Sequence, residues 1–225
     1  MSAAPSRFAD AFGDWTPRAV VFDCDGLLLD TESVWQRAQD RVVAAHGALL
    51  APEDDAVLHG STIEIAAELI ADRSGSEEQA VLADLHREFD RELDGGVRTL
   101  PGAAEVLRAA AAQVPLGCAS NSWLESLDDK LTAGGLREHF TVLEASDTVE
   151  RPKPAPDMYA QAARALGERP EDCLALEDSG TGARAARDAG LRLIAVPAPD
   201  HPVPPADLAL TSLTDPDLAA WIATW

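Results

Sequence analysis

The sequence predicts an α/β protein with a doubly wound parallel sheet and an inserted, all-helical segment. The first observation is an uninterrupted apolar, β-branched run at 19–22, typical of a strand buried on both faces of a parallel sheet. The second is an alternation of strand-like and helix-like segments from about residue 98 onward. The third is the stretch 31–97, which holds helical patterns and no convincing strand.

The sheet-forming parts of the chain are expected at 1–30 and 98–225. After the first strand, we expect strands at 116–119, 141–143, 173–176, 193–196 and 208–210. The helices that fit between them are 102–112, 122–133, 156–166 and 182–189. A last helix begins with Asp215 as its cap and Pro216 at its first position.

The segment 31–97 is expected to form a separate helical domain. Its helical patterns cover 31–45, 62–71 and 77–93, and Asp30 or Thr31 can cap the first of them. Two glycines at 95–96 and a Pro-Gly pair at 101–102 bracket the return of the chain to the sheet. Ahead of the first strand, the aromatic side chains of an N-terminal extension are expected to pack on the core or on a neighbouring molecule.

Composition excludes several classes of partner. The 225 residues are 46% apolar and carry 18 basic against 39 acidic side chains, a net charge of −21 that argues against nucleic acid. The chain has no apolar run of membrane-spanning length, and its first residues lack a secretion-signal pattern. Three cysteines lie in or beside predicted strands, as buried thiols of a reducing compartment do. We therefore expect a cytoplasmic protein, a monomer or a dimer, with no nucleic-acid or membrane partner.

Two aspartates, Asp23 and Asp25, follow the first predicted strand. This is where open α/β sheets bind ligands, and alternate residues of a strand point to one face. Two carboxylates so close repel each other unless a cation or a shared proton relieves the repulsion. The pair therefore predicts a functional site, and a metal ion at that site.

Polar residues follow two further strands. Ser120 ends the second and can offer its hydroxyl and neighbouring N–H groups to an oxyanion, or it can simply cap the next helix. Glu177 and Asp178 end the fourth and could supply oxygen ligands to Mg²⁺, although Asp178 or Ser179 could instead cap a helix.

Lys153 lies between two prolines, which hold it in an extended loop. It is one of only two lysines in the chain, the other being Lys130, so a compact cation is favoured at this position. An ordinary surface lysine is the alternative interpretation.

The order of these motifs resembles that of the haloacid-dehalogenase-like superfamily. Asp-x-Asp, then Ser, then a proline-flanked Lys, then Glu-Asp, each at a strand end, match it from about 20 to 196. The segments DCDGLLLDTE (23–32), KPAPD (153–157) and EDS (177–179) are similar to its phosphatase and β-phosphoglucomutase-like subgroup. The resemblance implies a Rossmann-like core and identifies 31–97 as similar to the mobile cap domain of that subgroup.

The resemblance also implies a reaction. It implies an Mg²⁺-dependent phosphatase that hydrolyses a small phosphorylated metabolite, such as a sugar phosphate, through an aspartyl-phosphate intermediate. Asp23 would be the nucleophile, and Asp25 the general acid and base. The presence of Asp25 favours an oxygen leaving group over the halide of a dehalogenase.

Ligand contacts follow from the same resemblance. Mg²⁺ would be held by Asp23, the backbone carbonyl of Asp25 and Asp178, with Glu177 assisting directly or through water. The phosphate oxygens would be bound by the side chains and N–H groups of Ser120, Asn121 and Lys153.

Two alternatives stay open at this stage. The first is a hexose-phosphate mutase of the β-phosphoglucomutase type. Those enzymes carry an Arg after a Gly-x-Ser-like turn, where Ile63 stands here. After the motif serine they carry polar and basic side chains that help to bind the sugar phosphate, where this chain has Asn121, Ser122, Trp123 and Leu124. Both departures favour the phosphatase. The second alternative is a non-catalytic metabolite-binding protein of the same fold, which the complete set of motif acids disfavours.

Substrate contacts from the helical segment are the least specific prediction. They fall on His59, Ser61, Thr62 and Arg87, of which the first three belong to a Gly-Ser turn. Arg87, or Arg98, could also replace the missing arginine of a mutase.

Overall fold

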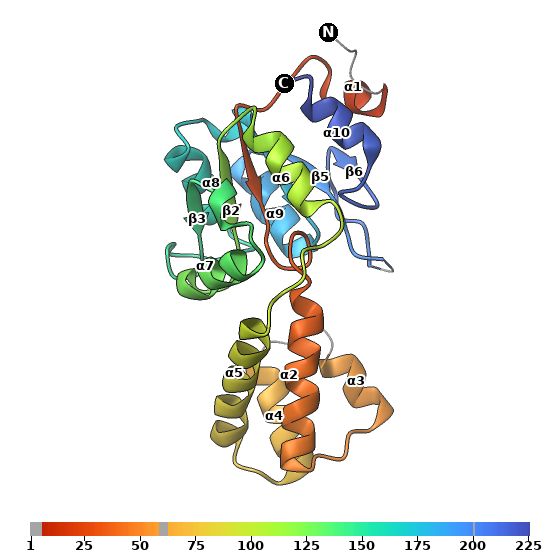
Figure 1. Ribbon diagram of the computed structural model, residues 1–225, viewed down its shortest axis with the longest axis vertical. Coiled ribbons are helices and arrows are strands. Elements are labelled where there is room, and N and C mark those ends of the chain that lie inside the picture. Colours follow the sequence, from red (N-terminus) through yellow and green to blue (C-terminus); the bar gives the residue numbers. More distant parts are fainter. Residues whose placement is uncertain (1–5, 59–62, 200) are drawn as a thin grey trace. The chain divides into compact units, whose positions relative to one another are not determined.

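The computed structural model (Figure 1) describes residues 6–58, 63–199 and 201–225. The chain forms two compact units: Met1–Leu29 with Thr99–Trp225, called here the α/β core, and Asp30–Arg98, called the helical unit. The function of the helical unit as a cap domain stays a prediction.

Within the described residues the core contains one six-stranded sheet, in which all neighbouring strands are parallel and the order is β3-β2-β1-β4-β5-β6. This order confirms the predicted doubly wound sheet. The strands are β1 Ala19–Phe22, β2 Leu116–Ala119, β3 Val142–Glu144, β4 Cys173–Glu177, β5 Arg192–Ala195 and β6 Leu208–Ala209. Every residue of β1, β2 and β4 is buried, as their unbroken apolar patterns predict.

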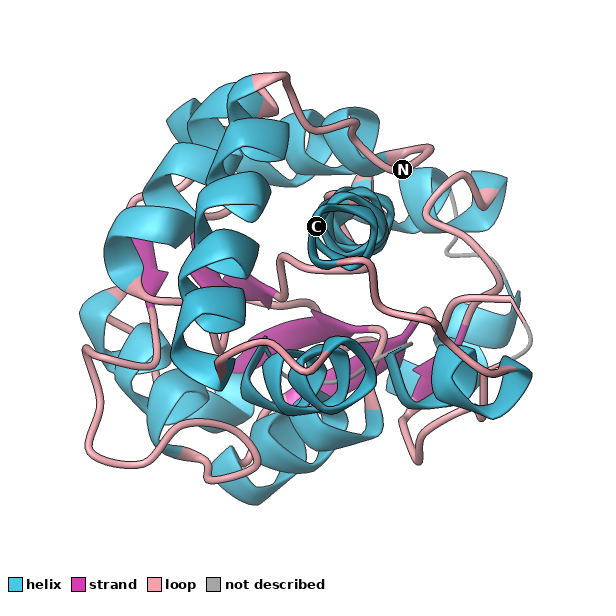
Figure 2. Ribbon diagram, turned by 90° about the horizontal axis from the view of Figure 1, so that it is seen from below, coloured by secondary structure: helices cyan, strands magenta, loops and turns pink. Residues whose placement is uncertain are grey.

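Helices cover both faces of this sheet. Figure 1 shows α6 in front of the sheet and α9 behind it, and Figure 2 shows the strands, in magenta, between layers of helix. The core helices are α1 Ser6–Phe12, α6 Ala103–Ala111, α7 Leu124–Ala133, α8 Asp157–Ala165, α9 Gly180–Ala189 and α10 Pro216–Ile222. Two short 3₁₀ turns, η1 Arg137–His139 and η2 Pro170–Asp172, precede β3 and β4.

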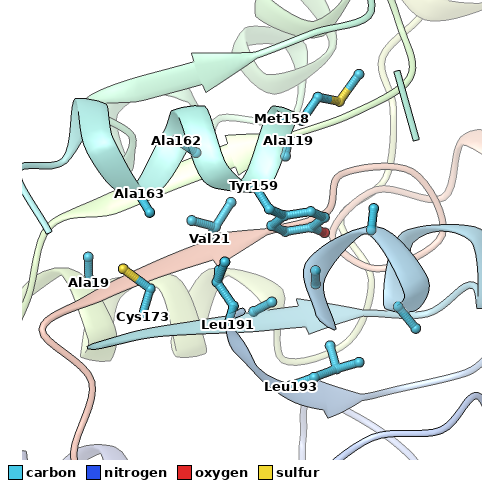
Figure 3. Packing of buried hydrophobic residues seen from close by; sticks show 14 residues of the cluster. Ala19, Val21, Ala119, Met158, Tyr159, Ala162, Ala163, Cys173, Leu191 and Leu193 are labelled. Carbon is cyan, nitrogen blue, oxygen red and sulfur yellow. The ribbon is translucent and has the colours of Figure 1, made fainter. Parts of the chain in front are cut away.

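The face of the sheet under α8 and α9 is packed with small side chains (Figure 3). Val21 of β1 and Leu193 of β5 lie in this cluster with Met158 and Tyr159 of α8. Alanines let the two helices approach the strands closely, since their side chains end at Cβ. These alanines are Ala162, Ala163, Ala183, Ala185 and Ala186. The tight packing fixes the aromatic ring of Tyr159, whose hydroxyl group belongs to the site described below.

The chain's first described helix, α1, was not predicted. It is seven residues long, shorter than an isolated helix that is stable in water, and tertiary packing holds it in place. Phe8 and Phe12 each stack on Trp221 of α10, with ring centroids 4.9 Å apart. The expectation that the N-terminal aromatic residues pack on the core is therefore correct for these two residues.

The helical unit contains α2 Thr31–His46, α3 Pro52–Leu58, α4 Ile63–Ser74 and α5 Glu78–Asp94. Asp30 caps α2 by accepting a hydrogen bond from the Ser33 N–H at 3.2 Å, and Gly47, at a φ of 66°, ends it. Apolar side chains from these helices form a core of their own, centred on Val42, Ile70 and Leu85.

Ion pairs tie the helices of this unit together. Asp54, at the start of α3, accepts two hydrogen bonds of 2.7 Å from Arg73 of α4, and this guanidinium lowers the pKa of Asp54 to about 2. Glu92 of α5 similarly accepts from Arg37, at 2.6 Å, and from Arg41, at 2.8 Å, on α2.

Two features bear on cellular context. Cys24, Cys118 and Cys173 are free and buried, as predicted. None of the helices in the described ranges combines the length and the apolar character needed to cross a bilayer.

Candidate active site

The polar residues predicted to form a site meet at one edge of the sheet. Strands β2, β1 and β4 are neighbours, so Ser120, Asp23 and Glu177 lie at adjacent carboxyl-terminal strand ends. Lys153 arrives from the loop between β3 and α8. The parallel sheet thus gathers residues more than 150 positions apart in the sequence.

Lys153 is the centre of a buried charge cluster. Its Nζ lies 2.6 Å from Oδ1 of Asp23 and 2.6 Å from Oε1 of Glu177. The Lys153 side chain is only 4% exposed, so it is not the surface lysine of the alternative interpretation. Tyr159 donates to the same Oε1 at 2.7 Å, and its ring centroid lies 5.0 Å from Nζ.

The loop that carries Lys153 is held by Asn121. The Asn121 amide accepts from the Lys153 N–H at 3.0 Å and donates to the Lys153 carbonyl at 3.1 Å. The side chain predicted to bind phosphate is thus engaged with the backbone of the lysine.

Glu177 is fully enclosed by protein donors. Oε1 accepts from Lys153 and Tyr159, while Oε2 accepts from the N–H and hydroxyl of Ser179, at 3.2 and 2.9 Å. Ser179, not Asp178, also caps α9 by accepting from the Gly182 N–H at 3.0 Å. A Cβ at position 182 would overlap the carboxyl group of Glu177, so only glycine fits there.

Asp178 lies against the loop that follows β1. Gly26 has a φ of 81°, and a Cβ at this position would overlap Oδ2 of Asp178. Carboxylate oxygens of Asp23, Glu177 and Asp178 all lie within 4.8 Å of one another. This clustered, hard-oxygen donor set fits a divalent cation such as Mg²⁺.

Electrostatics favour a cation as well. Burial raises the pKa of Asp23 well above its usual range, Lys153 opposes this, and the charges of Glu177 and Asp178 add to it. Burial, followed by the charge of Glu177, raises the pKa of Asp178 to about 7. Burial works against the charged form of Lys153, but Asp23 and other acidic neighbours outweigh it and raise the pKa of this lysine. One lysine beside three acids leaves room for further positive charge.

Asp25 belongs to a second network. Its Oδ2 accepts from the hydroxyl groups of Ser120, at 2.7 Å, and Ser122, at 3.3 Å. Lys130 of α7 donates to Oδ1 at 2.5 Å and to the Ser122 hydroxyl at 2.6 Å. Ser120 therefore contacts Asp25 and does not cap α7, whose N-cap is Trp123.

Lys130, Ser122 and Tyr159 were not predicted as site residues. Lys130 carried a signal in the sequence. It lies three residues after Leu127 and one before Leu131, on the buried stripe of α7, where a lysine is unusual. Burial works to lower the pKa of Lys130, but the charge and hydrogen bond of Asp25, together with Cys24 and Asp23, outweigh burial and raise this pKa.

Of the residues predicted to contact substrate from the helical unit, Arg87 is the one that the structure describes. His59, Ser61 and Thr62 lie outside the described residues. Arg87 pairs with Asp84 at 2.7 Å along α5, and its side chain is 65% exposed.

Two other positions bear on the mutase alternative. Ile63 packs against the apolar core of the helical unit. Arg98, which could have replaced the mutase arginine, is paired with Asp30 at 2.6 Å.

A strand edge that gathers an Asp-x-Asp pair, a buried lysine and further acids suits phosphoryl transfer, in which charge on the transferring group must be stabilised. The haloacid dehalogenase-like hydrolase family model matches residues 17–190, and the chain belongs to this family. The match confirms the resemblance recognised in the sequence.

Similar proteins include named phosphatases. Hexitol phosphatase B of Escherichia coli (strain K12) is 34% identical over 212 residues, which cover 89% of this chain and 96% of that protein. Fructose-1-phosphate phosphatase YqaB of the same strain is 31% identical over 179 residues, covering 79% and 95%. Together with the family match, these relatives confirm that the chain is a phosphoric monoester hydrolase.

A solved structure shows the same fold. CbbY from Rhodobacter sphaeroides, crystallised in complex with phosphate, superposes with a TM-score of 0.72 and 30% identity, covering 89% of this chain and 96% of that one.

Proposed function

We propose that this protein is an Mg²⁺-dependent phosphatase that hydrolyses a small sugar phosphate or sugar-alcohol phosphate through an aspartyl-phosphate intermediate. The observation that carries the proposal is the convergence of Asp23, Asp25, Lys153 and Asp178 at the ends of adjacent strands or in the loop beside them. The names of the two phosphatase relatives support the substrate class.

Asp23 is the nucleophile of the proposed reaction. Its carboxylate attacks phosphorus, the bond to the leaving oxygen breaks, and an aspartyl-phosphate forms. Asp25 donates a proton to the leaving oxygen and then removes one from the water that hydrolyses the intermediate, which releases inorganic phosphate and regenerates Asp23.

Lys153 neutralises charge on the transferring group. Its ammonium is held between Asp23 and Glu177, so it sits next to the attacking oxygen before substrate arrives. Asn121 fixes the Lys153 backbone, and Tyr159 and Ser179 fix Glu177. These contacts support a role for Glu177 chiefly in orienting Lys153.

Asp23 and Asp178 would hold Mg²⁺, together with the backbone carbonyl of Asp25, and Glu177 lies close enough to assist. When bound, the ion supplies positive charge that offsets the repulsion between these acids and the phosphate oxygens. This role agrees with the raised pKa of Asp178 and with the surplus of acids over lysines at the site.

The phosphatase is favoured over the mutase by the surroundings of Ile63. A mutase must grip a second phosphate, and here the corresponding position carries an apolar side chain packed in the core of the helical unit. Trp123, which follows the serine motif and is 72% exposed, offers an apolar surface and no charge.

A phosphate-release screen tests the proposal. The protein is incubated with a panel of hexose, pentose and hexitol phosphates with Mg²⁺ and again with EDTA. We expect turnover of at least one sugar-type phosphate with Mg²⁺ and none with EDTA. Turnover that EDTA does not affect would contradict the metal requirement, and no turnover on the whole panel would contradict the phosphatase itself.

A second assay separates the phosphatase from the mutase. Glucose 1-phosphate is supplied with a sugar bisphosphate primer, and both free phosphate and glucose 6-phosphate are measured. The proposal expects free phosphate without the isomer; accumulation of the isomer would show a mutase.

A further inference from the structure

Both lysines of the chain lie at the site, and each forms an ion pair with one aspartate of the Asp-x-Asp motif. Lys153 pairs with Asp23, and Lys130 pairs with Asp25, the other acid of the Asp-x-Asp motif. Both lysine side chains are buried, at 4% and 2% exposed. By contrast, the ion-paired arginine side chains of the described residues are all at least 39% exposed.

The environment of Lys130 requires a partner for its charge. Its stem lies on the buried stripe of α7 beside Leu127 and Leu131, and an ammonium in such surroundings is costly unless it is paired. Oδ1 of Asp25, at 2.5 Å, and the hydroxyl of Ser122, at 2.6 Å, are the acceptors that meet it. A helix-anchored stem also restricts where the ammonium can be.

These contacts fix the direction of the Asp25 carboxyl group. Lys130 holds Oδ1 from α7, while Ser120 and Ser122 donate to Oδ2 from the loop after β2. A planar carboxyl group held at both oxygens from two different elements has little freedom to rotate. The proton donor and acceptor of the proposed reaction is thus oriented before substrate binds.

We propose that Lys130 is a positioning residue, which orients the carboxyl group of Asp25 toward the leaving oxygen of the substrate; this rests on the proposed phosphatase function. Lys130 acts through Asp25 and Ser122 and does not itself transfer a proton. Lys153 supports the nucleophile, and Lys130 supports proton transfer, so each acid of the motif has its own lysine.

The two possible roles of Lys130, positioning and mere packing, differ in their dependence on the leaving group. A nitrophenolate leaves without a proton, whereas a sugar alkoxide needs one in the transition state. Misplacing Asp25 therefore slows cleavage of a sugar phosphate but barely affects cleavage of 4-nitrophenyl phosphate. A general loss of folded structure would slow both substrates equally.

The experiment measures kcat/KM, which reports the steps up to phosphoryl transfer. It is measured for the best sugar phosphate and for 4-nitrophenyl phosphate, in wild type and in the variants Lys130→Met, Lys130→Gln and Asp25→Asn. We expect Lys130→Met to lower kcat/KM on the sugar phosphate about 10- to 100-fold, within the range of a general acid's contribution, and on the aryl phosphate less than about 3-fold. Asp25→Asn should lower the ratio of kcat/KM on the sugar phosphate to kcat/KM on the aryl phosphate, and by more than Lys130→Met does. Lys130→Gln, which keeps a hydrogen-bond donor, should recover part of the loss.

The controls separate this inference from the proposed function. Leu131→Met changes a buried side chain of the same helix at nearly constant volume, and should leave the ratio of the two substrates unchanged. Equal losses on both substrates, or no loss, in Lys130→Met would overturn the inference while the phosphatase function stands. If Lys130→Met does not fold, the ratio in Lys130→Gln decides in the same way. A wild-type protein inactive on both substrates would overturn the function and the inference together.

Discussion

Charged side chains are arranged differently in the two units of this molecule. In the helical unit, Asp54 and Glu92 each meet arginines from another helix, so the charge of each of these two acids is neutralised by direct ion pairs. In the α/β core, four acids share one strand edge with two buried lysines, so negative charge is left in excess. Balanced pairs hold helices together, whereas accumulated like charge opposes folding and marks a binding site.

The largest effect is expected from removing the nucleophile. Asp23→Asn should lower phosphatase activity by more than about 1,000-fold, because the covalent intermediate cannot form. Its midpoint of thermal unfolding should stay near that of wild type or rise, because burial and the neighbouring acids, which raise the pKa of Asp23, outweigh the pairing of its charge with Lys153. Activity assays and calorimetry check the two parts. Undiminished activity in this variant would assign the turnover to another residue or to a contaminant.

The metal site gives the next effect. Asp178→Asn should weaken Mg²⁺ binding at least about 100-fold, the upper end of what even an outer-shell partner of a metal costs. Titration calorimetry with Mg²⁺ measures this affinity. Asp129→Asn, an exposed acid of α7, is the matched control and should bind Mg²⁺ like wild type. Equal affinities in the two variants would remove Asp178 from the ligand set.

The Glu177→Gln variant is expected to lose both stability and activity. The variant puts an amide donor where four donors already converge and takes an acidic partner from Lys153. Breaking a buried ion pair in this way should lower the free energy of unfolding by about 3 kcal/mol and reduce turnover as well. Urea denaturation measures the first quantity. A variant as stable as wild type would mean that Glu177 is not the anchor of Lys153.

The smallest effect is expected in the helical unit. Asp54→Asn should lower the thermal stability of this unit while leaving the charge cluster of the core intact. Because Arg73 holds the pKa of Asp54 at about 2, below its usual 3.8, the stabilisation is complete above pH 3.8 and is lost as pH falls toward 2. Wild type and variant should therefore differ at pH 6 and converge in acid. The exposed Asp90→Asn is the control, and a difference that grows in acid would contradict the sign.

The bounds of a strand could be predicted from the sequence where the strand coincides with an unbroken apolar run. The strands β1 and β2 begin and end where their apolar runs do. The strands β3 and β5 are each displaced by one residue from the predicted bounds, although the N–H groups of Thr141 and Val196 still donate to Leu116 and Glu177 of the neighbouring strands. The helices α1 and α3 are seven residues long, too short to show a helical period, and were missed.

The acidic residues of the site could be predicted from the sequence, but the residues that hold them in place could not. Asp23, Asp25 and Asp178 lie just after the ends of β1 and β4, and their motifs can be recognised directly in the sequence. Lys130 was missed because a charged residue on a helix is normally assigned to a solvated face. Its burial depends on Asp25, which lies 105 positions away, and such a contact exists only after folding.

The burial of both lysines has a practical consequence for chemical labelling. Amine-directed reagents such as succinimidyl esters find no exposed lysine side chain on the folded chain, since those at 130 and 153 are 2% and 4% exposed. Modification at either position therefore records a transient opening of the strand edge. Mass spectrometry of the tryptic peptides that contain Lys130 and Lys153 can follow the opening around Asp25 and around Asp23 separately.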